Sequence, residues 1–214
     1  MKLKYKSWQD ISINVFDKLK GVNSNIKDEI DVIDSNAELL AVLCDCSVDD
    51  ILNLSTSDFS KLLSEITFIK NMPKVDIKDK YTLNGKKYEL FLSMKNMTVA
   101  QYIDFQTYIK DREKYFKQLL SVFIIPKGKK YNEDYDVEEV INDIGNYLSV
   151  VDANSIMFFF VLLYQSSTKV ILNYLIKTLK KNKKMTQAER EKTEKAIIEL
   201  KKAQDLFRNG NGFI

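Results

Sequence analysis

This 214-residue chain contains no histidine, so the side chains that could do chemistry are its carboxylates, its two cysteines, and its lysines and tyrosines, for which no pattern in the sequence argues. Histidine is the commonest general base and the commonest metal ligand, so its absence argues against catalytic triads, most zinc hydrolase sites and histidine pH switches. Carboxylate pairs are present at Asp31 and Asp34, Asp49 and Asp50, and Glu138 and Glu139. Each pair falls near an expected helix start or on an expected exposed face, where negative charge complements the helix dipole. We therefore expect no catalytic residue and no enzymatic activity.

Cys44 and Cys46 are the only cysteines, and a single residue separates them. A four-ligand zinc site needs more sulfur than this, and cysteines so close rarely reach the geometry of a disulfide with each other. We expect reduced thiols, as in a cytosolic-type protein. The glycines are isolated or in turns, so no phosphate-binding loop is present, and the acidic segment 132–136 lacks the ligand spacing of a calcium loop. The sequence predicts no metal site and no cofactor.

The composition is that of a folded protein rather than a disordered one, with 45% hydrophobic and 29% charged residues. A net charge of +3 is too small to indicate specific binding to nucleic acid. The segment Pro126 to Tyr135 combines lysines with tyrosines, as a patch for a phosphate backbone would. Its acidic neighbours Glu133, Asp134 and Asp136 favour a solvated connection instead.

No membrane span is expected. The most apolar run, IMFFFVLLY at residues 156–164, has nine residues, whereas a helix needs about twenty to cross the hydrocarbon core. This run is expected to form a helix buried on nearly all sides. The N-terminus MKLKYKSWQD lacks the apolar run of a signal peptide, so we do not expect secretion by that route.

Residues 81–110 contain the elements with the clearest local signals. Asn84 and Gly85 stand between alternating apolar residues, which predicts a two-residue β-hairpin turn. The side chains expected to point inward are Leu83, Tyr88, Leu90 and Leu92. Thr98 and Gln101 have the spacing of a capping box, so a helix is expected to begin there.

Apolar residues on this helix, Tyr102, Phe105 and Ile109, recur at intervals of three and four. Such spacing places an aromatic stripe on one face, and Tyr108 adds a further ring to it. The stripe is interpreted either as ordinary core or as a surface for a partner protein.

The remaining pattern is also helical, and few prolines and glycines interrupt it. Helix starts are expected at Ser12, Ser47, Ser57 or Asp58, Asp136, Ser149 and Thr186. Residues 25–43 fit one helix or two, and residues 111–125 fit a broken helix that ends before Pro126. The predicted fold class is mainly α, a helical bundle with one small β-hairpin at about residues 81–92 and an extended C-terminal helical arm. Its expected segments are residues 1–72, residues 73–184, which form one domain with the former, and residues 185–214.

The C-terminal arm has a narrow apolar seam between charges of both signs, formed by Ala196, Ile197, Leu200, Ala203 and Phe207. So thin a seam is typical of a packing arm or a partner-contacting helix, and equally of a terminal helix docked on its own domain. The final residues Phe213 and Ile214 could insert into a neighbouring subunit.

The order of the segments YKSWQDISI, NGKKYEL, MTVAQYIDFQ, LLSVFIIPKGKKYNEDYD and SVVDANSIMFFFVLL resembles a family of proteins from tailed bacteriophages of Bacteroidales hosts, including crAss-like phages. The resemblance covers roughly residues 5–165, and MTVAQYIDFQ and FIIPKGKKY are its most distinctive motifs. Members of this family belong among virion morphogenesis proteins, which implies either a structural ring of the neck or tail or a tail assembly chaperone. The family has no catalytic residues to carry over.

The resemblance therefore implies a homo-oligomeric ring in the neck or tail of a virion assembled in the bacterial host cytoplasm, with the portal or adjacent rings as partners. In a ring, the arm from Thr186 to Ile214 would reach the next copy. In a chaperone, Tyr102, Phe105 and Tyr108 would hold a helical client. A DNA-contacting or host-directed protein is a third hypothesis, which strong salt dependence of DNA binding would support.

Overall fold

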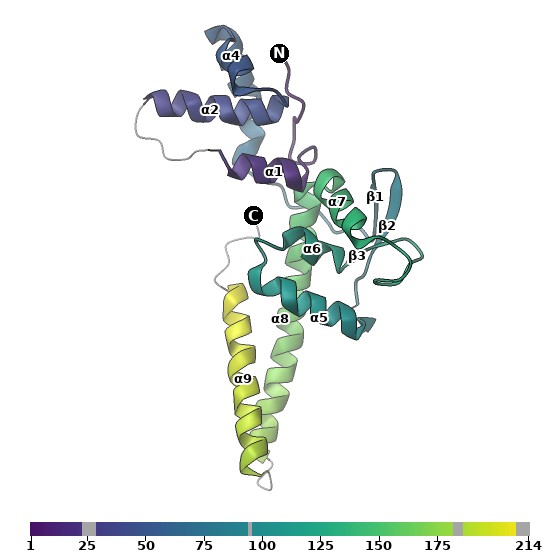
Figure 1. Ribbon diagram of the computed structural model, residues 1–214. Coiled ribbons are helices and arrows are strands. Elements are labelled where there is room, and N and C mark those ends of the chain that lie inside the picture. The colour runs from purple at the N-terminus through teal and green to yellow at the C-terminus, as the bar shows by residue number, and fades with distance from the viewer. Residues whose placement is uncertain (23–28, 94–95, 182–185, 209–214) are drawn as a thin grey trace. The chain divides into compact units, whose positions relative to one another are not determined.

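The computed structural model describes residues 1–22, 29–93, 96–181 and 186–208. The chain divides into two compact units, Met1–Ser155 and Ile156–Ile214. Helices dominate the described residues, and one small sheet accompanies them (Figure 1). The mainly α class is confirmed. The first unit contains the whole of the expected segment of residues 1–72 and the hairpin that follows it, and the division falls at residues 155 and 156.

Short helices form the N-terminal region of the first unit. Their bounds are α1 Ile13–Lys20, α2 Glu29–Cys44, α3 Val48–Leu52, α4 Thr56–Glu65 and the 3-10 helix η1 Thr67–Lys70. Ser12 caps α1 and Ser47 caps α3 as predicted, because each side chain accepts a hydrogen bond from a backbone N–H of the first turn. Helix α4 begins earlier than predicted. Its cap is Ser55, and not Ser57 or Asp58, since the Asp58 N–H donates to Ser55 Oγ at 3.1 Å.

Helix α2 is a single helix over residues 29–44. Of the two predictions for residues 25–43, one helix or two, the structure has one helix, and residues 25–28 lie outside the described residues. Ala37, Leu40 and Leu43 are buried at helical spacing, and α2 contacts α1, α3 and α4.

The predicted hairpin forms, and a third strand joins it. The sheet contains β1 Lys80–Leu83, β2 Lys86–Leu90 and β3 Ile124–Pro126 in the order β1-β2-β3, with both pairs antiparallel. Asn84 has φ 51° and Gly85 has φ 73°, which is the left-handed backbone that a type I′ turn requires at both positions. Alternation buries Leu83, Tyr88 and Leu90. Leu92 was also predicted to point inward, but it is 43% exposed because it lies beyond the end of β2.

Strand β3 corrects the prediction of a helix up to Pro126. The helix in that region, α6, ends at Ser121. Ile124 and Ile125 are β-branched and pair with Leu90 and Glu89 of β2. Since β2 offers a free edge there, pairing with it satisfies the backbone of these residues better than one more helical turn.

Helix α7, Val137–Tyr147, lies at the centre of the first unit and contacts α1, α6 and β1. The helices that precede it are α5 Val99–Tyr108, η3 Ile109–Asp111 and α6 Phe116–Ser121, and α5 contacts η3 and α6. Asp136 caps α7 as predicted, and the break expected near Asp111 is present between α5 and α6. Gly145 permits close contact with α1, because a Cβ there would lie 2.8 Å from Asn14 Oδ1.

Helix α8, Val150–Lys181, begins in the first unit, and its later turns make up the second unit with α9, Gln187–Arg208. Figure 1 draws these as a pair of antiparallel helices. The expected C-terminal helix is thus present as α9. Thr186 caps it as predicted, because its Oγ1 accepts from the Glu189 N–H at 3.3 Å. The apolar run is not buried on all sides as predicted. Phe160 is 1% exposed but Phe158 is 57% exposed, because residues two apart lie on opposite sides of a helix.

Candidate functional site

The sequence motif MTVAQYIDFQ contains the beginning of α5, and a capping box starts this helix. The Gln101 N–H donates to Thr98 Oγ1 at 3.1 Å, and the Thr98 N–H donates to Gln101 Oε1 at 3.0 Å. The amide nitrogen of the Gln101 side chain points into the first unit, where Nε2 donates to Val122 O at 3.2 Å. Because both ends of this amide are bonded, Gln101 can be only 2% exposed.

Phe105 lies one turn after Gln101 and completes the buried side of α5. It is 1% exposed, and its ring meets that of Phe123 edge to face, with centroids 5.6 Å apart. Tyr108, a further turn on, is half-buried and lies against Tyr115, with ring centroids 5.6 Å apart. Gln101, Phe105 and Tyr108 therefore form the inward line of the helix.

The outward face of α5 is apolar. Val99 is 76% exposed, Tyr102 is 52% exposed and Ile103 is 56% exposed. These positions are spaced i, i+3 and i+4, so the three side chains form one patch over a single turn. We call Val99, Tyr102 and Ile103 the α5 face. Single exposed apolar residues are common, but a contiguous patch is typical of an interaction site.

The structure separates the residues that the sequence placed on one aromatic stripe. Tyr102 is on the α5 face, whereas Phe105 belongs to the core and Tyr108 is half-buried beside it. Phe105 therefore has no surface to offer a partner. Sequence reasoning missed Val99 and Ile103, because it followed the aromatic residues along the helix. The capping box was the signal that could have revealed the true orientation, since it satisfies the Gln101 amide and allows its burial.

The predicted contact residues of the C-terminal region are placed only in part. Ile197 on α9 is 9% exposed, while its neighbour Ile198 is 53% exposed. Leu200 and Phe207 belong to α9, and their side chains lie outside the described portion of the chain, as do Phe213 and Ile214.

A buried carboxylate attaches the hairpin to α7. Asp143 is 4% exposed and accepts hydrogen bonds from the Tyr88 hydroxyl at 2.6 Å and from Asn84 Nδ2 at 3.1 Å. Lys86 Nζ lies 3.4 Å from the same carboxylate and 2.6 Å from Glu139. Burial and the hydrogen bond to Asp143 raise the pKa of Tyr88. The phenol therefore stays protonated and acts as a donor.

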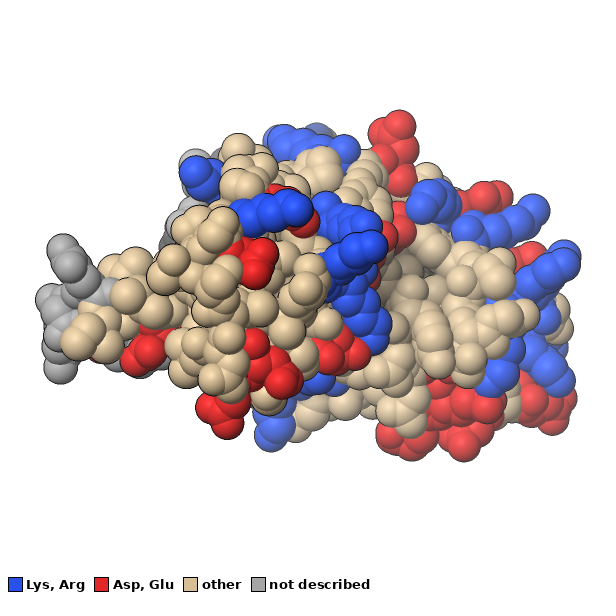
Figure 2. Space-filling model, turned by 90° about the horizontal axis from the view of Figure 1, so that it is seen from above, with Lys and Arg blue, Asp and Glu red and all other residues tan. Residues whose placement is uncertain are grey.

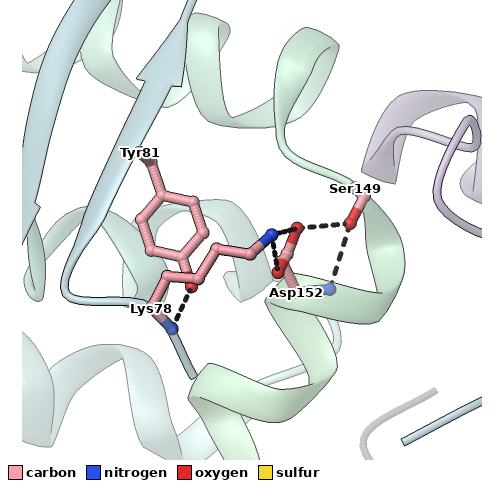
Figure 3. Close-up of polar contacts among 4 residues, drawn as sticks. All are labelled: Lys78, Tyr81, Ser149 and Asp152. Carbon is pink, nitrogen blue, oxygen red and sulfur yellow. Dashed lines mark hydrogen bonds and ion pairs between the residues drawn. The ribbon is translucent and has the colours of Figure 1, made fainter. Parts of the chain in front are cut away.

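A second polar cluster fixes the start of α8 (Figure 3). The Asp152 N–H donates to Ser149 Oγ at 3.1 Å, and Ser149 Oγ donates to Asp152 Oδ2 at 2.8 Å. Lys78 Nζ lies 3.1 Å from Asp152 Oδ1, and the Lys78 N–H donates to the Tyr81 hydroxyl at 3.4 Å. Burial and the nearby charge of Asp152 raise the pKa of Tyr81 to about 12.

The surroundings of the buried tyrosines and of the two cysteines favour binding and structural roles over nucleophilic chemistry for these side chains. Burial, helped by Asp104, also raises the pKa of Tyr131, which donates to Asp104 Oδ2 at 2.7 Å. Burial raises the pKa of both Cys44 and Cys46, so each remains a thiol at neutral pH. A nucleophile or a general base needs the opposite shift.

Two of the carboxylates noted as pairs in the sequence have ordinary structural partners. Asp50 completes the capping box of α3, and Glu139 pairs with Lys86. Over the residues that the structure describes, no three side chains of the types that bind metals come together as a metal site. Figure 2 shows lysines and arginines beside aspartates and glutamates on the same face, so neither sign of charge covers it.

No protein-family model matches the chain, and neither a curated protein nor a solved structure matches it. Within the described ranges, no helix is both long enough and apolar enough to span a bilayer.

Proposed function

We propose that this protein is a structural component of a tailed-bacteriophage virion, a ring-forming head-tail connector, neck or tail protein that acts through protein–protein contacts. The observation that carries the proposal is the α5 face, where Val99, Tyr102 and Ile103 are 76%, 52% and 56% exposed. These residues lie in MTVAQYIDFQ, one of the most distinctive motifs of the resemblance to virion morphogenesis proteins. The same segment therefore supplies both the resemblance and the surface.

The energetics of the α5 face suit a permanent contact. Full burial of one large apolar side chain contributes about 1.5–3 kcal/mol, so three neighbours on one turn form a substantial anchor. The helix beneath them is held by the Thr98 capping box and by Phe105 in the core. Little conformational freedom is then left to lose on association, which favours affinity.

The partners in this proposal are further copies of the chain and neighbouring neck or tail proteins, such as the portal or adjacent rings. The second contact in this proposal is assigned to helix α9, on which Ile198 is 53% exposed. In a closed ring each copy uses two different surfaces, one for each neighbour. The site of action would be the virion, after assembly in the bacterial host cytoplasm.

Electron microscopy of the purified protein tests the proposal, since rings are visible directly, and light scattering gives their mass. The double variant Val99→Ser/Ile103→Ser is expected to lose the multimer. The matched control Ile33→Ser/Leu52→Ser also removes two aliphatic side chains that are each 50% exposed, and it should assemble normally. A wild-type protein that stays monomeric at every concentration would contradict the ring.

A tail assembly chaperone is the second candidate. The feature in its favour is the same α5 face, which could hold a helical client while the particle assembles. Mass spectrometry of purified virions separates the two functions. A stoichiometric amount of this protein in the particle supports the ring, and its absence together with a complex with another tail protein supports the chaperone.

Truncation after Lys184 tests the contribution of α9. The ring hypothesis expects the truncated chain to lose its multimer while the circular-dichroism signal of its helices still melts cooperatively. Unchanged assembly would assign the contact to the α5 face alone.

A further inference from the structure

The solvent face of the sheet carries a lysine from each of the first two strands and the lysine that follows the third. Strand alternation places Lys80 of β1 and Lys87 of β2 on the side opposite to the buried Tyr81 and Tyr88. Lys127 follows β3 and continues its register, because its N–H donates to Lys87 O at 2.9 Å. We call Lys80, Lys87 and Lys127 the lysine face.

The lysine face surrounds a hollow. Its volume is about 240 Å³, and the residues that line it are Lys80, Tyr81, Thr82, Lys87, Tyr88 and Lys127. The Thr82 side chain stands opposite Lys87 in the β1–β2 register, so a hydroxyl joins the ammonium groups. A hollow with these donors around it is suited to an anion.

The lysine face is unfavourable for the isolated chain. Lys87 and Lys127 occupy facing positions on neighbouring strands, and like charges there destabilise a sheet. Glu89 lies opposite Lys80, yet among the described residues none of the three lysines has a carboxylate within 4.0 Å. Lys86, by contrast, pairs with Glu139 at 2.6 Å. The ion pair with Glu139 thus neutralises Lys86, and the three lysines of the lysine face are left for an external anion.

The surroundings of the lysine face favour carboxylates over single-stranded nucleic acid. A site for single-stranded nucleic acid combines basic groups with exposed aromatic rings on which bases stack. Tyr81 and Tyr88 are 7% and 1% exposed. Tyr131, the nearest tyrosine after Lys127 in the sequence, is 9% exposed and bonded to Asp104. None of these three rings is therefore presented to a base.

The chain itself has a matching acidic segment before and at the start of α7. Its carboxylates are Glu133, Asp134, Asp136 and Glu138. Lys130 lies 3.6 Å from Glu133, which leaves this segment with a negative balance. The Tyr88 hydroxyl bonds Asp143 of α7, so α7 lies behind the sheet and the lysine face in front of it. Opposite charges on two different surface segments are what a head-to-tail contact between copies requires.

We infer that the lysine face of one copy binds the acidic segment 133–138 of the next copy. This inference rests on the proposed function, because it requires that copies associate, and it adds a polar contact that is separate from the α5 face. Such a contact stays partly exposed to water. It fixes the orientation and register of neighbouring copies, and it weakens as the salt concentration rises.

Charge reversal of both surfaces tests the inference on the full-length protein. One variant is Lys87→Glu/Lys127→Glu, and the other is Glu133→Lys/Glu138→Lys. Asp134 is left unchanged because it holds a left-handed backbone at φ 56°, and Asp136 because it caps α7. The readouts are multimer mass by light scattering and association by analytical ultracentrifugation, with circular dichroism to confirm folding.

Each variant alone is expected to associate at least about tenfold more weakly than wild type. Lys87→Glu/Lys127→Glu places negative charge against the acidic segment, and Glu133→Lys/Glu138→Lys cancels the net negative charge of that segment. The quadruple variant, and an equimolar mixture of the two double variants, should both regain the multimer. The neutral variant Lys87→Gln/Lys127→Gln should weaken association less than Lys87→Glu/Lys127→Glu does.

Three outcomes would overturn the inference, and they remain distinguishable. If wild type forms rings and both reversed variants form them equally well, the lysine face is not the contact, while the proposed function stands. If wild type stays monomeric, the proposed function fails together with the inference. Retention of a DNA duplex that is lost only in Lys87→Glu/Lys127→Glu, with assembly unchanged, would assign the lysine face to nucleic acid and also overturn it.

Discussion

The phenol of Tyr88 donates a hydrogen bond of 2.6 Å to Oδ2 of Asp143 and so joins β2 to α7 inside the first unit. A buried carboxylate is costly unless it is bonded, and Asn84 and Lys86 supply the other partners of this one. All three partners come from the hairpin. The hydrogen bonds to Asp143 therefore hold the hairpin on α7 and keep the lysine face turned toward solvent.

Replacing Tyr88 by phenylalanine should lower the free energy of unfolding by about 1–3 kcal/mol, because Asp143 then loses its shortest hydrogen bond while it stays buried. Chemical denaturation measures the change. Tyr147→Phe is the matched control, since Tyr147 is 54% exposed on the same helix that carries Asp143, and its effect should stay within about 0.5 kcal/mol. Equal effects of the two substitutions would show that the Asp143 cluster does not stabilise the hairpin.

Gly145→Ala should destabilise the protein by about 1 kcal/mol or more, although alanine normally stabilises a helix interior. The reason is contact with α1, since the new Cβ would lie 2.8 Å from Asn14 Oδ1 and 3.0 Å from Lys117 Cδ. Asn14 Nδ2 donates to Asn146 Oδ1 at 2.8 Å, and Lys117 Nζ donates to Asn14 Oδ1 at 2.9 Å. The Asn14 side chain therefore cannot move away freely.

A double-mutant cycle isolates this contact. In an Asn14→Ala background the Gly145→Ala substitution should be much less destabilising, because both Asn14 atoms that meet the Cβ are gone and Lys117, no longer bonded to Asn14, can move aside. Strict additivity of the two free-energy changes would refute the contact as the cause.

Stability should fall as pH rises above about 10, in part through Tyr81. The pKa of this phenol in the folded protein is about 12, whereas an unfolded tyrosine titrates near about 10. Between these values the folded state binds more protons than the unfolded state, so the stabilisation is complete below the lower pKa and is lost as pH rises through the upper one. Tyr88 and Tyr131 shift in the same direction and add to the slope.

The measurement is the free energy of unfolding at several pH values above neutrality, for wild type and for Tyr81→Phe. The variant should show a shallower fall over the alkaline range, with some of the slope retained through Tyr88 and Tyr131. An identical slope in the variant would mean that Tyr81 does not titrate with the expected shift.

Two aromatic residues of α5 should respond in opposite ways. Phe105→Ala should cost about 3–5 kcal/mol of stability, because it removes a buried ring packed on Phe123. Tyr102→Ala should change stability by no more than about 0.5 kcal/mol, since Tyr102 is 52% exposed. In the assembly assay Tyr102→Ala should weaken the multimer more than Phe105→Ala does. A large loss of stability from Tyr102→Ala would place that ring in the core after all.

Local chemistry determined much of this fold from the sequence by itself. The Asn84–Gly85 turn forms because two successive residues tolerate a left-handed backbone, and the caps at Ser12, Ser47 and Thr98 form because their hydroxyls reach unpaired N–H groups within three residues. Such signals depend on neighbours in the chain, so they can be recognised without knowledge of the rest of the molecule. The mainly α class follows from them.

Which neighbours each helix face or strand edge contacts was decided only by the tertiary structure. Ile124 and Ile125 fitted the end of a helix until the free edge of β2 made a strand of them, and Gln101 is buried because Val122 O, twenty-one positions away, accepts from its amide. The lysine face likewise brings together residues 80 and 87 from two strands and residue 127 just after the third. The spacing of residues within one segment carries no information about such distant partners. The burial of a side chain and the charge of a surface both depend on those partners.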